Sequence, residues 1–123
     1  IQNVTFNNMD ASDLSSFGDN EFDVAVSSMA VHQFDAGLAL GILKEMKRIA
    51  PVIILMDYNY PVPPGIIRPV IYTIEWIAGG DHYRNFKMYN RLGGLDYFTR
   101  ESGLAITSGS LRGRNAFRII SCK

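Results

Sequence analysis

Apolar and polar positions along the first half of the chain predict two strands with a helix between them. Phe22–Ser27 holds a continuous apolar run and is predicted as a strand covered on both faces. Val52–Met56 is the most hydrophobic run of the chain and is predicted as a central strand. Between them, apolar residues recur at helical spacing after Asp35, a good N-cap, until Pro51 ends the pattern. The pattern therefore predicts strand, helix and strand in this order.

The second half predicts two further helices and a closing hairpin. Ile66–Ala78 is apolar almost all round and is predicted as a helix, and Leu95–Ser102 as a shorter helix that ends at Gly103. Ala105–Leu111 and Ala116–Cys122 flank a short turn and are predicted to pair as a hairpin. The polar and aromatic segment between the two helices is assigned no element.

The alternation of strands and helices predicts the fold class. We expect an α/β fold with a mostly parallel sheet and one antiparallel strand contributed by the terminal hairpin. Val4–Phe6 is a further short strand candidate. With 123 residues, the chain is expected to form a single domain over residues 1–123.

The amino-acid composition limits the classes of binding partner and the cellular location that we expect for the chain. Twelve basic and twelve acidic residues balance, so neither nucleic acid nor a membrane surface is expected to attract the chain through its total charge. No apolar run reaches the ~18 residues of a membrane span. Cys122 is the only cysteine and is expected to be an inert buried thiol, which favours a reducing, cytoplasmic location. No metal site is predicted.

An ordered set of residues from the first loop to the central strand suggests a family. It comprises Asp10-Ala11, Leu14, Phe17, Asp19, Phe22-Asp23-Val24, Ser27-Ser28, His32, the helix end Leu43 to Pro51, and Val52 to Asp57. This set resembles the middle of class I S-adenosylmethionine-dependent methyltransferases, and the closing hairpin resembles their sixth and seventh strands. The resemblance implies a Rossmann-like sheet of which this chain is the C-terminal part.

The resemblance also implies cofactor contacts. Asp10 stands where the family's loop carboxylate accepts a hydrogen bond from the adenine amino group, and Ala11 where a backbone N–H meets the adenine ring. Ser28 stands where a strand end touches the methionine part of S-adenosylmethionine. The family's first strand and its glycine-rich turn have no counterpart here, since no G-x-G-x-x-G or G-x-G-x-G pattern occurs. Together with the start at Ile1, this suggests a truncated domain, expected to bind the cofactor weakly or not at all.

The same part of the chain contains a histidine and a pair of oppositely charged residues whose roles can be predicted. His32 is a candidate catalytic base, although a lone His after a buried strand is more often a packing or hydrogen-bonding residue. Glu45 and Arg48 are expected to form an ion pair on the helix surface that contributes little.

The aromatic residues of the second half are candidates for a substrate pocket. The helix Ile66–Ala78 after the fifth strand and the segment Tyr83–Gly103 are similar in layout to small-molecule methyltransferases of quinone biosynthesis, which implies a small-molecule methyl acceptor. For Tyr72 and Trp76, filling of the core is the alternative. The candidates are Tyr72, Trp76, His82, Tyr83, Phe86 and Tyr89.

The missing first strand predicts an exposed sheet edge. In the family that strand pairs with the one matched here by Phe22–Ser27, so this strand is expected to be unpaired on one side. We expect the chain to form a homodimer or a strand-completed oligomer, or to fill the vacancy with Val4–Phe6. The leading hypothesis is methyl transfer to a small molecule in the parent protein, the chain alone being inactive. The alternative is a non-catalytic α/β module that pairs with a partner chain.

Overall fold

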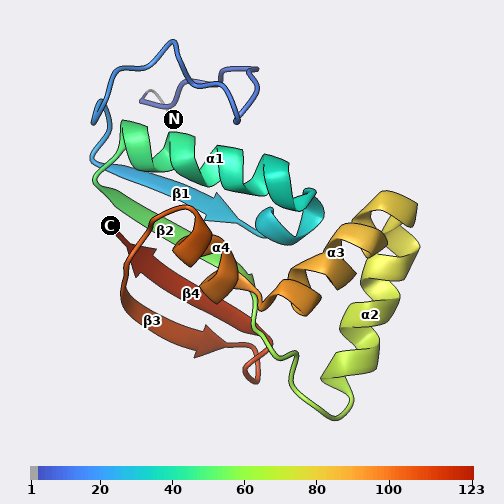
Figure 1. Cartoon of the computed structure of the whole chain (residues 1–123). Helices are drawn as coiled ribbons and strands as arrows, with labels where there is room; N and C mark the ends of the chain where they lie inside the picture. Colours follow the sequence, from blue (N-terminus) through green and yellow to red (C-terminus); the bar gives the residue numbers. More distant parts are fainter. Residues whose placement is uncertain (1–2) are drawn as a thin grey trace.

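The most hydrophobic run of the chain forms the centre of a four-stranded sheet. The structure is a computed structural model that describes residues 3–123. Strand β2 (Val52–Tyr58) pairs in parallel with β1 (Val24–Ser28) and antiparallel with β4 (Phe117–Cys122). Strand β3 (Ile106–Arg112) pairs antiparallel with β4, so that the sheet order is β1-β2-β4-β3 (Figure 1). The predicted α/β class, with a terminal antiparallel strand in a mostly parallel sheet, is confirmed.

The helices form where apolar periodicity and capping residues place them. Helix α1 (Ala36–Ile49) starts at Asp35, whose carboxylate accepts the backbone N–H of Leu38 at 3.1 Å. Helix α2 (Ile67–Ala78) and helix α4 (Leu95–Glu101) match the two helices predicted for the second half.

Helix α3 (Gly80–Leu92) has no counterpart among the predicted elements. Gly79 separates it from α2 with a φ of 115°, and Gly93 ends it with a φ of 116°, a left-handed conformation that glycine adopts without steric cost. Its buried side chains include Phe86 and Tyr89 amid a polar sequence, so its apolar stripe is too narrow to stand out.

One face of the sheet carries the hydrophobic core. Ile53 and Leu55 of β2 and Ile120 of β4 are fully buried and pack with Leu43 of α1 and Phe98 of α4. Figure 1 shows α1 and α4 on the same side of the sheet. Val24 and Val26 of β1 point to the other face and are 45% and 65% exposed, so the expectation that this strand is covered on both faces is wrong.

The predicted strand Val4–Phe6 is wrong. Residues 4–6 belong to no strand, and Val4 and Phe6 are exposed to solvent. Three residues between asparagines bury too little surface to hold a strand without a neighbour. The N-terminal segment therefore does not fill the vacancy beside β1. Across residues 3–123, the helices are also too short or too polar to cross a membrane.

Candidate active site

Charged side chains meet where two parallel strands end. The chain turns at Met29, immediately after β1, and a short 3-10 helix, η1 (Val31–Gln33), places His32 beside Asp57 near the end of β2. The backbone N–H of Met29 donates to the carbonyl of Met56 at 2.8 Å, which fixes the turn to the neighbouring strand. Ligands of open parallel sheets bind beyond this edge, so the cluster lies where a site is expected.

Asp57 is fully buried, and three N–H groups hold its carboxylate. Oδ1 lies 2.6 Å from Nδ1 of His32 and accepts the backbone N–H of Tyr58 at 2.7 Å. Oδ2 accepts the backbone N–H of His32 at 3.2 Å. The contact of 2.6 Å is a hydrogen bond between Nδ1 of His32 and Oδ1 of Asp57. This fixes the orientation of the imidazole ring.

Glu75 approaches the same ring from α2. Its Oε1 lies 3.4 Å from Nε2 of His32 and accepts the hydroxyl of Tyr58 at 2.8 Å. Burial, and then the hydrogen bond to Glu75, raise the pKa of Tyr58 well above its usual value near 10, so its hydroxyl stays protonated and donates. Glu75 is the only acidic residue of α2 and is buried. His32 therefore lies between two carboxylates from two different elements.

Aromatic rings enclose this cluster of His32, Asp57, Tyr58 and Glu75, which we call the buried network. The His32 ring lies 4.7 Å from that of Tyr58 and 6.3 Å from that of Tyr89. The hydroxyl of Tyr89 donates to the carbonyl of Tyr58 at 2.7 Å, and burial raises the pKa of Tyr89. With His32 only 1% exposed, a molecule that meets its ring must first displace a neighbour.

The network contains three functional candidates that the sequence did not single out. Asp57, Tyr58 and Glu75 each contact another member of the network from a different part of the chain. An acid at the end of the most apolar strand, and a lone acid in an apolar helix, are the signals that could have found Asp57 and Glu75. The predicted catalytic role of His32 stays a prediction, and its hydrogen-bonded burial agrees with the alternative.

The predicted cofactor residues occupy two separate segments. Asp10 and Ala11 lie exposed in the N-terminal loop, where the N–H and hydroxyl of Ser12 donate to Asp10 Oδ1 at 2.9 and 2.7 Å. These two bonds lower the pKa of Asp10, which is therefore an anionic acceptor at neutral pH. Ser28 is exposed at the end of β1, directly before the turn to η1. The predicted roles of Asp10, Ala11 and Ser28 in cofactor binding stay predictions.

Arg48 holds the loop with Asp10 and Ala11 against α1. Its guanidinium donates to the carbonyls of Leu14 and Phe17 at 2.8 and 2.9 Å, and to the carboxylate of Asp19 at 2.9 Å. It also pairs with Glu45, whose carboxylate accepts the N–H of Leu14. The expected ion pair between Glu45 and Arg48 is present, and its role is larger than predicted, because it anchors the loop.

Three of the predicted substrate-pocket residues come together. Tyr72, Trp76 and Tyr83 line a shallow hollow of about 290 Å³ between α2 and α3. Phe86 is buried and packs edge-on against Tyr72 at 5.1 Å, whereas His82 is exposed and does not line this hollow. Trp76 is 67% exposed, so core filling is wrong for this residue. Tyr89 belongs to the shell of the buried network.

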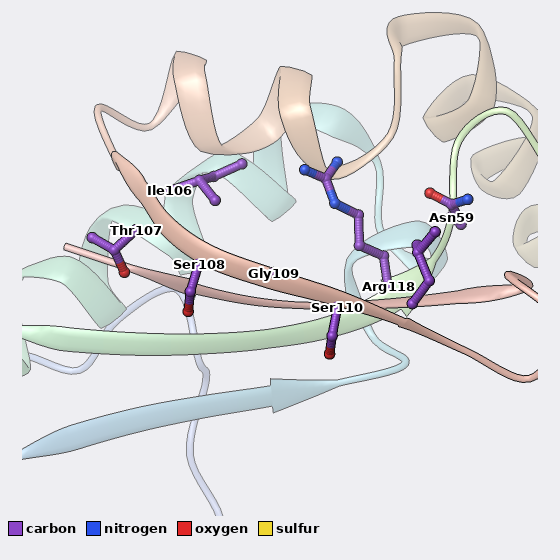
Figure 2. Close-up of a pocket in the computed structure, with 8 residues that line it drawn as sticks. Asn59, Ile106, Thr107, Ser108, Gly109, Ser110 and Arg118 are labelled. Atoms are coloured by element: carbon purple, nitrogen blue, oxygen red, sulfur yellow. The ribbon is translucent and has the colours of Figure 1, made fainter.

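Another hollow, of about 480 Å³, lies along β3 (Figure 2). Its lining comes mainly from residues 106–111, with Asn59 and Arg118 beside them. Arg118 pairs with Asp96 of α4 at 2.8 Å, so its charge is already compensated. This hollow therefore lacks a free acid or base. Over residues 3–123, no group of three or more His, Cys, Asp and Glu side chains is placed to hold a metal ion.

Comparisons with known proteins identify the fold. No family model matches the chain, and no curated protein matches its sequence. Among solved structures, TnmH superposes with a TM-score of 0.71 at 16% identity, over 99% of this chain and 35% of TnmH. An O-methyltransferase family protein from Burkholderia thailandensis gives a TM-score of 0.67 at 14% identity, over 99% of this chain and 36% of its own.

A third structure is that of magnesium protoporphyrin IX methyltransferase from Synechocystis PCC 6803 with bound SAH. Its TM-score is 0.55 at 15% identity, over 96% of this chain and 50% of the enzyme. The chain has the fold of the C-terminal part of a class I methyltransferase. It spans between about a third and a half of these three methyltransferase-like structures. The predicted methyltransferase-like fold is thus confirmed, and truncation of the domain stays a prediction.

Proposed function

We propose that this chain is the C-terminal half of an S-adenosylmethionine-dependent methyltransferase that acts on a small molecule. The observation that carries the proposal is the sheet order β1-β2-β4-β3 with a single antiparallel strand, in a chain that superposes over 99% of its length on an O-methyltransferase family protein. The free, buried Cys122 supports a cytoplasmic location for this activity.

Asp10, Ala11 and Ser28 are the proposed cofactor contacts. Asp10 offers an anionic oxygen to the adenine amino group, Ala11 a backbone N–H to the ring, and Ser28 a hydroxyl to the methionine part. When bound, S-adenosylmethionine supplies a methyl group that its sulfonium activates. These residues form one side of the site only, so we expect this chain alone to bind the cofactor weakly and not to turn over.

The acceptor is proposed to lie at the same end of the molecule. Tyr72, Trp76 and Tyr83 offer aromatic surface to it, and the chain contributes mainly by aligning it for in-line attack. For an acceptor that loses a proton, His32 is the proposed base, with Asp57 orienting its ring. Proton transfer then requires that the acceptor replace Glu75 at Nε2, because this atom faces the Glu75 carboxylate.

A titration of the isotope-labelled chain with S-adenosylhomocysteine tests the proposed cofactor contacts. We expect amide shifts at residues 10–12 and 28–29 that saturate only at millimolar concentration. Asp10→Ala is expected to abolish the shifts at 10–12. Asp13→Ala is the matched control, since Asp13 is an exposed loop carboxylate that accepts the N–H of Ser15 in the same kind of turn.

Two results would contradict parts of this proposal, namely the cofactor contacts and the expected weak binding. If neither segment shifts at millimolar ligand, the assignment of Asp10, Ala11 and Ser28 is wrong. A micromolar dissociation constant from calorimetry would instead overturn the expectation that this chain holds only one side of the site.

A second function is favoured by the outer edge of β1. Within residues 3–123 this strand pairs only with β2, and Val24 and Val26 are exposed on the uncovered face. We propose as the alternative that the chain is a non-catalytic module whose β1 edge pairs with a second chain, either another copy or the missing half of the sheet.

A further inference from the structure

Helix α2 exposes an apolar face that carries no charge. Its charged residues are Arg68, which donates to the carbonyl of Val62, and Glu75, which belongs to the buried network. The opposite side presents large apolar side chains to solvent over three turns, and contiguous exposed apolar faces mark interaction surfaces. These are Ile66 (74% exposed), Val70 (49%), Ile74 (53%), Trp76 (67%) and Ile77 (71%).

Helix α3 adds a row of basic side chains beside this face. Arg84, Lys87 and Arg91 follow one another at helical spacing and are exposed. The Nζ of Lys87 lies 4.6 Å above the ring of Tyr83, and Arg84 pairs with the exposed Asp81 at 3.1 Å.

The apolar and basic surfaces join at one residue. Tyr72 lines a hollow with Trp76 and Tyr83 on one side, and a second hollow with Lys87 and Arg91 on the other. Figure 1 shows α2 and α3 side by side beyond the arrowhead of β1. We call this combined surface the hairpin face.

Five of the twelve acidic residues of the chain gather in one loop away from this face, whereas Asp81 lies on α3 itself and pairs with Arg84. Residues 10–23 contain five Asp and Glu and no Lys or Arg. The loop that holds them lies along α1, tied to Glu45 and Arg48. Although the total charge is balanced, the charges are unevenly distributed, with an acidic loop on α1 and basic side chains on the hairpin face.

We propose that the hairpin face docks on an anionic lipid surface. An uncharged apolar helix face flanked by Lys and Arg is the composition that lies in the interface of a bilayer, with basic groups at the lipid headgroups. A second copy fits less well, because α2 has no exposed acid that two-fold pairing could bring to the basic row of α3. When the hairpin face meets the lipid, the acidic loop lies on α1 and not on the contacting face, so its negative charges do not oppose binding. The proposal departs from the expectation drawn from total charge and does not depend on methyl transfer.

Trp76 reports on this contact directly, because it is the only tryptophan of the chain. The full chain is mixed with phosphatidylcholine vesicles that either contain or lack phosphatidylserine. We expect a blue shift of the Trp76 emission and co-sedimentation with the anionic vesicles only, both weakened by added salt.

Paired substitutions locate the surface. Ile77→Glu is expected to abolish vesicle binding, whereas Val26→Glu, at an exposed valine on the uncovered sheet face, leaves it unchanged. The double variant Lys87→Ala/Arg91→Ala is expected to bind about tenfold more weakly or worse, as two basic groups at such a surface imply. Arg112→Ala/Arg114→Ala in the hairpin turn is its control. Circular dichroism establishes that each variant is folded.

Three outcomes would overturn the proposal. The first is a chain that stays in the supernatant with unshifted emission. The second is equal binding to neutral and anionic vesicles, or equal binding by the Lys87/Arg91 and Arg112/Arg114 double variants. The third is a lipid-free dimer by sedimentation that Ile77→Glu dissociates, which would assign the face to a second copy.

Discussion

At the scale of single residues, we expect the stability of the fold to depend most on the buried network. His32 lies between Asp57 and Glu75, and all three are almost completely buried. A buried ionisable group is tolerated only with partners, so each member compensates the desolvation of the others. Removing one member leaves the rest without compensation.

The two histidines of the chain test this dependence. His32→Ala leaves two buried carboxylates without their common partner, and we expect it to lower the free energy of unfolding by about 3 kcal/mol. His82→Ala removes an exposed side chain and is expected to change it by less than about 0.5 kcal/mol. Urea denaturation monitored by circular dichroism measures both. Equal effects would show that the network does not stabilise the fold.

Two buried tyrosines predict how stability changes in alkali. The pKa values of Tyr58 and Tyr89 are raised above 10 in the fold, mainly by burial. The stability that these raised pKa values contribute is therefore complete below pH 10. It is lost as the pH rises further, because the tyrosines of the unfolded chain release their protons at a lower pH than those of the folded chain. We expect the free energy of unfolding to fall above about pH 10. Tyr58→Phe should flatten this fall, and an unchanged stability in that range would contradict the assignment.

The members of the buried network can be predicted from the sequence one by one, but their contacts with one another cannot. His32 could be found as a lone His after a strand, and Asp57 and Glu75 as acids in apolar runs. Their contacts could not be predicted, because they join residues 25 and more positions apart through η1, β2 and α2. Only the packed arrangement of these elements brings the three side chains together.

At the scale of elements, Arg48 connects helix α1 to the loop that carries the proposed adenine contacts. Arg48→Ala removes the donors to the carbonyls of Leu14 and Phe17, and we expect faster amide hydrogen exchange over residues 12–22. Lys44→Ala, at an exposed position of the same helix, should leave the exchange unchanged. Unaltered protection in the Arg48 variant would mean that other contacts hold the loop.

Elements with a clear apolar period could be predicted, and the others could not. β2 and α1 follow from a continuous apolar run and from a capped amphipathic pattern, both of which are local properties. Helix α3 was missed because few of its residues are buried, and tertiary contacts of Phe86 and Tyr89 hold it in place. Val4–Phe6 was predicted as a strand from a local run, but a strand also needs a neighbour.

At the scale of the whole molecule, the sheet is covered on one side and open on the other. Leu55 and Ile120 face the helices, whereas Val26 points to the other face, and within residues 3–123 the outer edge of its strand β1 has no partner. An apolar strand with an open edge is a template for pairing with another chain. This geometry agrees with both proposed functions, since either a second copy or further strands of a methyltransferase sheet would pair with the same edge.

Self-association follows as the prediction at this scale. We expect sedimentation velocity to show a concentration-dependent dimer of the wild-type chain at micromolar concentration. Val26→Lys should shift the equilibrium to monomer, because a charged side chain beside the β1 edge opposes strand pairing and desolvation. Ile77→Lys, at an equally exposed apolar position on α2, is the control and should still dimerise. A stable wild-type monomer would rule out pairing between copies and leave only a different chain as the partner of this edge.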